Sequence, residues 1–174
     1  VAIFPELCSR HSGAPVEPHA DELLATLKSV APLPSSADPV VVLLPPGIYN
    51  SAYYEHSFLA DKLGIELVEG RDLLIKSEMV YMRTTEGPKR VDVIYRRLDD
   101  AYIDPLCFRP DSMLGVPGLM DVYRPGGVSL CSAPGAGVAD GTAVSTHVPE
   151  MILFYAGEEP MLRHVPAGTC RGAG

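Results

Sequence analysis

The residues with the clearest chemical potential form a charged run within VDVIYRRLDD, at positions 91–100. Arg96 and Arg97 end a segment predicted as a strand, and Asp99 and Asp100 follow almost at once. A planar guanidinium binds a carboxylate or phosphate through two parallel hydrogen bonds. Ligands of open α/β sheets bind beyond the carboxyl ends of the strands, so this position favours a ligand site.

The same run has a second interpretation that needs no ligand. Successive residues of a strand point to opposite faces, so we expect at most one of the two arginines to face a crevice. Both could instead pair with Asp99 and Asp100 as a solvated rim, where an ion pair contributes only ~0–1 kcal/mol. The local sequence gives the two interpretations about equal weight.

Two other loops follow predicted strands. PPGIYNSAYYEH leads into a helix, whose first N–H groups can hold an anion. Asn50 or Ser51 would also cap that helix, and capping alone is favoured by roughly two to one. In the loop at 132–140, Gly135 and Gly137 allow the backbone to approach a ligand closely. A plain glycine-rich turn is the commoner meaning of such a loop.

The sequence has no motif for a metal or nucleotide site, and a Ser-His-Asp triad stays open although no motif marks its nucleophile. It contains no G-x-G-x-x-G, no P-loop and no G-x-S-x-G elbow. The histidines have no metal-ligand spacing, so we expect surface or helix-capping roles for them. They are His11, His19, His56, His147 and His164. The four cysteines are widely scattered and are interpreted as reduced, partly buried thiols. They are Cys8, Cys107, Cys131 and Cys170.

Apolar periodicity indicates the elements that would position these loops. The predicted helices cover 20–31, 52–64, 115–127 and 143–159, the last restarting at Pro149. The predicted strands cover 40–44, 65–70, 91–97 and 128–134, and a hairpin covers 72–83. Tyr53, Tyr54 and Phe58 are predicted to lie in the core. This alternation predicts an α/β fold with a Rossmann-like, mainly parallel sheet, flanking helices and a small β-hairpin.

The domain organisation follows from the same pattern. We expect an N-terminal helical segment and linker at 1–38, an α/β domain at 39–165 and an irregular tail at 166–174. The 174 residues, 47% of them hydrophobic, suit one domain of ordinary size.

Charge and hydrophobicity exclude several classes of partner. The net charge of −8 without a basic run argues against nucleic-acid binding. The apolar runs are too short to cross a bilayer, and no signal peptide opens the chain. These features predict a cytoplasmic protein.

Long blocks of the sequence resemble the circularly permuted ATP-grasp proteins of bacteria, often described as glutathionylspermidine synthase-like. The resemblance covers almost the whole chain. Its blocks are FPELCSRH, PPGIYNSAYYEHSFLADKLGIELVEGRDL, VYMRTTEG, RVDVIYRRLDDAYIDPLCFRPDSMLGVPGLMDVYR, APGAGVAD and VPEMI. YRRLDDAY is also similar to the Tyr-x-Arg-Asp-Gly-Tyr segment of eukaryotic glutathione synthetase. By that likeness, Arg97 matches the arginine that holds a substrate carboxylate, Arg96 supports it, and Tyr102 lies near the second tyrosine.

The resemblance implies a reaction and a division of labour. ATP would phosphorylate a carboxylate, and an amine would attack the acyl phosphate to form an amide bond. ATP and Mg²⁺ would be needed in the full-length parent but are not expected to bind this chain alone, because 174 residues cannot also hold the ATP-binding subdomains.

We therefore expect the substrate-binding, pre-ATP-grasp-type domain of a ligase, present as a fragment. Its partners would be small-molecule or peptide carboxylate and amine substrates, and the missing ATP-grasp subdomains. The alternative is a non-catalytic binding or interaction module that has lost those subdomains.

Overall fold

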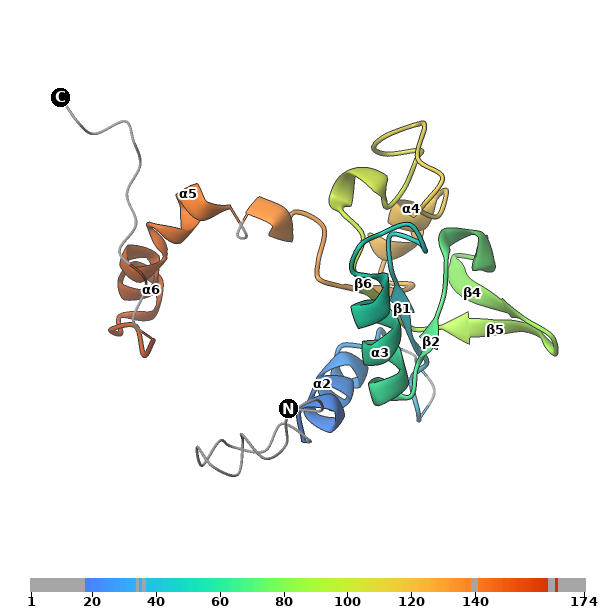
Figure 1. The fold of residues 1–174 in the computed structure, drawn as a ribbon, viewed down its shortest axis with the longest axis horizontal. Coiled ribbons are helices and arrows are strands. Elements are labelled where there is room, and N and C mark those ends of the chain that lie inside the picture. Colours follow the sequence, from blue (N-terminus) through green and yellow to red (C-terminus); the bar gives the residue numbers. More distant parts are fainter. Residues whose placement is uncertain (1–17, 34, 36, 139–140, 163–164, 166–174) are drawn as a thin grey trace. The chain divides into compact units, whose positions relative to one another are not determined.

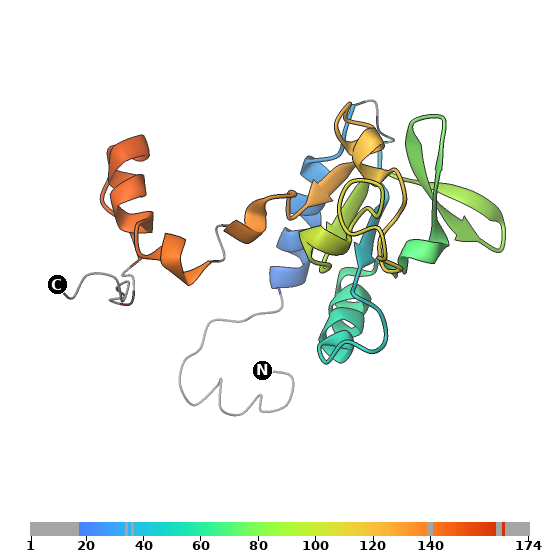
Figure 2. The ribbon, with the colours of Figure 1, turned by 90° about the horizontal axis from the view of Figure 1, so that it is seen from above.

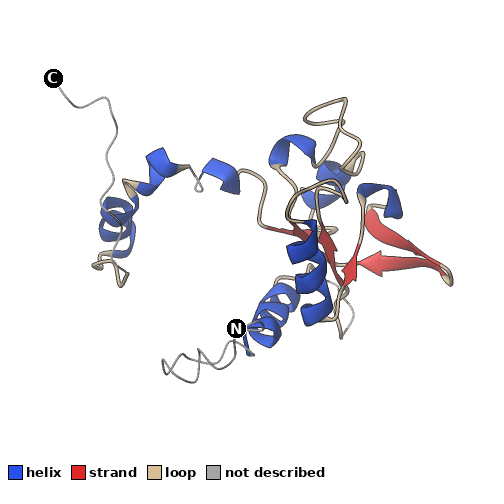
Figure 3. Cartoon of the chain, in the orientation of Figure 1, coloured by secondary structure: helices blue, strands red, loops and turns tan. Residues whose placement is uncertain are grey.

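The computed structural model describes residues 18–33, 35, 37–138, 141–162 and 165. The chain divides into two compact units, residues 1–132 and 133–174, and each unit is considered by itself. The first contains both β-sheets, and the described part of the second is built from short helices and turns (Figure 3). The domain boundaries expected at 38 and 165 stay predictions, and the tail at 166–174 lies outside the described residues.

A parallel sheet forms the centre of the first unit and confirms the predicted α/β fold (Figure 1). Its strands, in spatial order, are β2 (Glu66–Leu67), β1 (Val41–Leu44), β6 (Val93–Arg96) and β7 (Ser129–Cys131). All four residues of β1 are buried, as expected for an apolar, β-branched strand covered on both faces. The carboxyl ends of β1 and β6 meet at one edge, where Leu44 lies opposite Arg96.

Two helices cover one face of this sheet (Figure 2). They are α2 (Pro18–Ser29) and α3 (Tyr53–Leu63), which match the predicted helices. Leu27 of α2 and Leu63 of α3 pack with Val41 and Val93, the strand residues that point toward the helices. Gly64 ends α3 in the left-handed conformation at φ 64°, as its position after the apolar helix predicts.

The opposite face of the sheet packs on a larger apolar cluster. Val42 and Ile94, one position along from the helix-facing valines, contribute to it. Most of its other members come from β7, from connecting segments, from α4 and from an antiparallel sheet of three strands. The helix and the three antiparallel strands are α4 (Leu119–Tyr123), β3 (Leu73–Lys76), β4 (Met79–Thr84) and β5 (Gly87–Val91).

The predicted hairpin is confirmed in β3 and β4. These strands pair from Leu73 opposite Met82 to Lys76 opposite Met79. Ser77 and Glu78 form the turn between them, with φ values of 50° and 60°. Two consecutive residues of positive φ are typical of the tight turn whose twist matches that of the flanking strands.

The prediction of one strand over 91–97 is wrong, because the chain changes sheets at Asp92. Val91 ends β5 in the antiparallel sheet, and Val93 begins β6 in the parallel sheet. Asp92 is buried between them, and its side chain accepts a hydrogen bond from the Val40 N–H at 2.9 Å. The strand over 87–91 was missed because glycine, proline and two cations carry no strand signal, although Pro88 is tolerated on an edge strand.

Three expectations about burial are also wrong. Tyr54 and Phe58 were expected in the core, but both are exposed and stack on each other with ring centroids 6.3 Å apart. His56, expected at the surface, is only 6% exposed because it lies on the face of α3 that also buries Ala60. The thiol of Cys107 is exposed rather than partly buried.

The remaining elements are short. The 3₁₀ turns are η1 (Gly70–Asp72), η2 (Asp100–Tyr102) and, in the second unit, η3 (Ala136–Val138). The second unit also contains α5 (Thr142–Ser145) and α6 (Val148–Ala156). Pro149 occupies the first turn of α6, which confirms the predicted restart of the helix.

The buried carboxylate of Asp104 organises the long connection between η2 and α4. It accepts hydrogen bonds from the N–H groups of Leu106 at 2.9 Å, Gly118 at 3.0 Å and Met120 at 2.9 Å. Gly118 and Met120 open α4, so one side chain closes the loop and satisfies the start of the helix.

Replacing Asp104 with alanine is expected to lower the free energy of unfolding by at least ~3 kcal/mol, because three N–H groups lose their side-chain acceptor inside the protein. Urea unfolding followed by far-ultraviolet circular dichroism measures the change. Asp111→Ala, an exposed change in the same connection, serves as control and should stay within ~0.5 kcal/mol of the parent. Equal destabilisation by both substitutions would contradict the role of Asp104.

Candidate functional site

The candidate site lies where β1, β2 and β6 end. The backbone N–H of Arg97 donates to the carbonyl of Leu44 at 2.8 Å, which ties the exits of β6 and β1 together. Likewise, the Val68 N–H donates to the carbonyl of Leu43 at 2.9 Å, which ties the end of β2 to β1. Three loops therefore leave one edge of the parallel sheet, the edge at which ligands of such sheets bind.

Arg96 is buried and held in place by its neighbours. Its Nε donates to the carbonyl of Ser132 at 2.6 Å, and its Nη1 donates to the carbonyl of Leu98 at 2.6 Å. Its Nη2 forms an ion pair with Asp100. The side chain is 7% exposed, so the guanidinium acts as a structural link between the segments that follow β6 and β7.

Arg97 has the opposite environment. It is exposed, and its guanidinium carbon lies 5.9 Å from the centre of the Tyr95 ring, a weak cation–π contact. Within the described part of the chain, no carboxylate forms an ion pair with Arg97. A cation at a strand end without an internal anion is the arrangement that suits an anionic ligand.

The other predicted residues near the run have local partners. The Asp99 carboxylate accepts from the Ala101 N–H at 3.4 Å and caps η2. The hydroxyl of Tyr102 accepts from Nη1 of Arg109 at 2.9 Å, and the Arg109 guanidinium also lies 4.9 Å from the centre of the Tyr102 ring. Arg109 in turn pairs with Asp111 at 2.8 Å, which raises the pKa of the guanidinium and lowers that of the carboxyl.

Asn50 shapes the entry to α3 but is not its N-cap. The side-chain oxygen of Asn50 accepts from the Ala52 N–H at 2.9 Å, a turn that aims the chain into the helix. Ala52 itself occupies the cap position without a side-chain cap. The expectation that Asn50 or Ser51 is the capping residue is thus displaced by one or two positions, and Ser51 is exposed.

His56 is a functional candidate that sequence reasoning placed at the surface. It is buried in α3, and its Nδ1 has no hydrogen-bond partner among the described residues. Burial lowers the pKa of its imidazole, the charge of Arg97 lowers it further, and Glu55 acts in the opposite direction. A neutral imidazole therefore lies near the exposed arginine.

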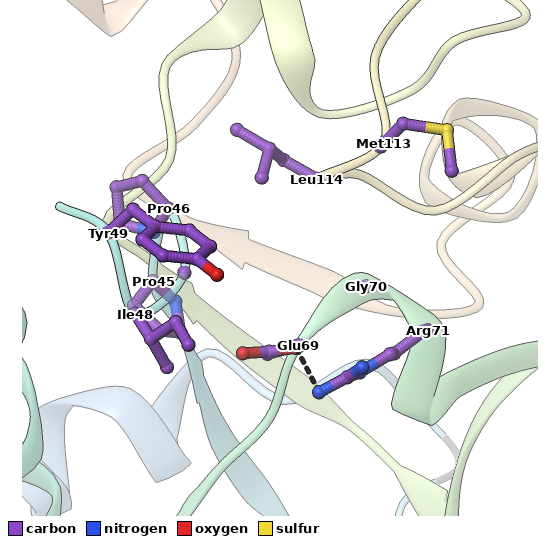
Figure 4. A pocket seen from close by; sticks show the side chains of 10 residues that line it. Pro45, Pro46, Ile48, Tyr49, Glu69, Gly70, Arg71, Met113 and Leu114 are labelled. Carbon is purple, nitrogen blue, oxygen red and sulfur yellow. Dashed lines mark ion pairs between the residues drawn. The ribbon is translucent and has the colours of Figure 1, made fainter.

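Beyond the ends of β1 and β2 there is a pocket of about 260 Å³ (Figure 4). Figure 4 shows Leu114 on one side, the ion pair of Glu69 and Arg71 on the other, and Tyr49 beside Pro46 on a third side. The lining residues are Pro45, Pro46, Gly47, Ile48, Tyr49, Glu69, Gly70, Arg71, Met113 and Leu114. The strand-end loop after β1 was predicted as a ligand loop, but none of the predicted site residues lines this pocket.

Two glycines fix the walls of the pocket by backbone contact. A Cβ on Gly70 would lie 2.4 Å from the carbonyl oxygens of Leu114 and Gly115. A Cβ on Gly115 would lie 2.2 Å from the carbonyl oxygen of Tyr102 and 2.3 Å from that of Ile103. Any larger residue would push these segments apart, so the spacing of η1 and the 113–115 segment depends on both glycines.

The glycine-rich loop belongs to the second unit. Gly135 has a φ of 92°, and Gly137 lies within η3. Their predicted part in substrate binding stays a prediction. No three His, Cys, Asp or Glu side chains among the described residues are placed to hold a metal ion. In the same part of the chain, no helix combines the length and apolar character needed to span a membrane.

Comparison with known proteins identifies a family and several relatives. The sequence model of a family described as a circularly permuted ATP-grasp matches residues 1–173. An uncharacterized protein of Synechocystis sp. is 57% identical over 167 residues, covering 96% of this chain and 34% of the relative.

More distant relatives occur in Mycobacterium tuberculosis. One uncharacterized protein is 53% identical over 168 residues, covering 97% of this chain and 30% of the relative. Another is 36% identical over 162 residues, covering 93% of this chain and 18% of the relative. The chain thus spans about a third or less of these proteins.

The lowered pKa of His56 predicts a pH-dependent stability. Between the unfolded pKa near 6.5 and the lower folded value, the unfolded chain binds a proton that the folded chain does not. The free energy of unfolding should therefore fall as the pH drops through and below ~6.5. In His56→Gln this part of the dependence should vanish.

Urea midpoints measured at a series of pH values between neutrality and the carboxylate range test this expectation. His19→Gln, an exposed change in α2, is the control and should keep the parent profile. Identical profiles for the parent and His56→Gln would show that His56 titrates as it does in the unfolded chain.

Proposed function

The chain belongs to the circularly permuted ATP-grasp family, and from this membership we propose that it is the substrate-binding part of an ATP-dependent carboxylate–amine ligase. The relatives are about three to six times as long as the matched region, which leaves room in them for ATP-binding segments. The proposal therefore concerns a parent protein of which this chain is one portion.

In the proposed reaction, the terminal phosphoryl group of ATP is transferred to a substrate carboxylate. An amine then attacks the resulting acyl phosphate, an amide bond forms, and inorganic phosphate leaves. This chain would hold the carboxylate substrate in position, since fixing reactants in a productive geometry supplies much of the rate of such reactions.

The exposed position of Arg97 is the main support for the proposal. Its guanidinium is exposed at the carboxyl edge of the parallel sheet, without an ion-pair partner among the described residues. The neighbouring Arg96 is buried and bonded at that position, so the backbone carrying Arg97 is fixed. The planar guanidinium of Arg97 can bind a carboxylate through two parallel hydrogen bonds.

We also propose that ATP and Mg²⁺ are bound by segments of the parent outside this chain, because the relatives are about three or more times as long as the matched region. When bound, Mg²⁺ would offset the charge of the phosphoryl group in transfer. Because the reaction consumes ATP, we also propose that the parent works in the cytoplasm.

A more specific part of the proposal is the identity of the carboxylate substrate. The resemblance to glutathionylspermidine synthase-like proteins suggests glutathione or a γ-glutamyl peptide as the carboxylate substrate, with Arg97 as its principal contact. Asn50, at the loop after β1, is a further candidate contact at the same edge.

Calorimetric titration of the chain with glutathione and γ-glutamyl peptides tests the proposal. We expect carboxylate binding that Arg97→Ala weakens by about tenfold or more, the loss typical of a charged hydrogen-bonding partner. Arg83→Ala, which removes an exposed arginine from β4, is the matched control and should leave binding unchanged.

Titration with ATP completes the experiment. Binding of ATP to this chain alone would contradict the division between substrate and ATP segments. Carboxylate binding that is the same in Arg97→Ala and the parent would remove the proposed contact. Carboxylate binding in a parent protein that forms no amide product would favour the alternative, a non-catalytic binding module of the same fold.

A further inference from the structure

We propose that the pocket beyond β1 and β2 binds an α-amino acid with a large apolar side chain. The pocket contains one carboxylate and one guanidinium, 2.8 Å apart, from Glu69 and Arg71. All its other side chains are apolar except for the Tyr49 hydroxyl. The ligand must therefore match an adjacent pair of opposite charges and an apolar surface.

The two charged groups are complementary to a zwitterion. A ligand of a single charge would be attracted by one of them and repelled by the other, which lie within one ion-pair distance. The ammonium and carboxylate of an α-amino acid are attached to the same carbon atom. They can lie beside Glu69 and Arg71 respectively, so that four alternating charges form a closed arrangement.

Glu69 is positioned before any ligand arrives. Its side chain accepts a hydrogen bond from the first turn of η1, and its own N–H donates to the Asp72 carboxylate at 2.9 Å. The Glu69 side chain is 25% exposed, so it is partly shielded from water. A fixed and partly desolvated carboxylate binds an ammonium group more strongly than a fully solvated one does.

The guanidinium of Arg71 has more N–H donors than its ion pair with Glu69 uses. Its ion pair with Glu69 is made through Nη2, and the side chain is 80% exposed. A guanidinium has five N–H groups, so a second carboxylate can be bound without breaking the first contact. The proposed ligand carboxylate would use the donors that face away from Glu69.

The apolar lining of the pocket determines the kind of side chain that the ligand would carry. A cavity of 150 Å³ holds benzene in an engineered protein, and this pocket measures about 260 Å³. Leu114 and Tyr49 both line the space (Figure 4), and Tyr49 and Met113 are 98% and 90% exposed. A side chain of the size of phenylalanine would cover this apolar surface, whereas glycine would leave it in contact with water.

The inference does not rest on the ligase reaction. The pocket uses neither Arg97 nor any other residue proposed to hold the carboxylate substrate. Within the first unit it occupies the β2 side of the sheet edge, whereas Arg97 follows β6 on the other side of β1. The two proposals can therefore fail separately.

Titration of the ¹⁵N-labelled chain with L-phenylalanine, followed by amide chemical shifts, tests the inference. We expect saturable shifts at Gly47, Gly70 and Leu114. Three probes each lack one feature: 2-phenylethylamine has no carboxylate, 3-phenylpropanoate has no ammonium, and glycine has no apolar side chain. Each should bind about tenfold more weakly or worse, the usual effect of losing a charged contact or a buried side chain.

Charge-removing variants test whether the charges of Glu69 and Arg71 bind the amino acid. Glu69→Gln keeps the acceptor used in η1 while removing the charge, and Arg71→Gln removes the cation at an exposed position. Each should weaken phenylalanine binding by about tenfold or more. Glu66→Gln and Arg83→Gln make the same charge changes at exposed positions of β2 and β4, and both should bind like the parent.

Two results with the parent chain would overturn the inference. One is the absence of saturable shifts at the pocket at concentrations approaching the solubility of phenylalanine. The other is equal binding of phenylalanine and its two single-charge analogues, which would mean that the pocket recognises only an apolar group. Arg97→Ala should bind phenylalanine as the parent does, and loss of binding in that variant would place the amino acid at the proposed carboxylate site instead.

Discussion

The burial of the Arg96 guanidinium is the constraint on which the sheet edge depends. A cation removed from water is tolerated only when its donors are bonded and its charge is balanced. Arg96 meets this requirement with two carbonyls and one carboxylate, and these partners belong to the ends of β6 and β7 and to the loop between them. The residue that follows it points to the opposite face of the sheet, where Arg97 is exposed.

In the rest of the first unit, the parallel sheet that ends at this edge is packed on both of its faces. Alternate residues of β1 and β6 pack on helices α2 and α3, and their neighbours pack on the antiparallel sheet and α4. The pocket is formed differently, since its walls are held by direct contact of backbone segments at Gly70 and Gly115. One edge of one sheet thus presents an isolated cation beyond β6 and a partly apolar pocket beyond β2.

Most of the fold could be predicted from the sequence, because β1, α2, α3 and the β3–β4 hairpin have strong apolar periodicity and clear turn signals. The strand over 87–91 could not, since its pairing with β4 gives it an extended form that Gly87 and Pro88 do not indicate. The burial of His56 and the exposure of Phe58 depend on how α3 is rotated against the sheet, which spacing alone leaves open. Glu69 and Arg71 form a pair only because a 3₁₀ turn brings them together.

The edge strand β5 has a consequence for the behaviour of the protein in crowded solution. An open sheet edge is a template to which a strand of another molecule can add, and such addition leads to fibrous aggregates. Pro88 lacks the N–H that an incoming strand would need, and the exposed Lys89 next to it brings a charge that must stay hydrated. Pro88 and Lys89, which carry no strand signal, are therefore the residues that disfavour addition of a neighbouring strand at the β5 edge.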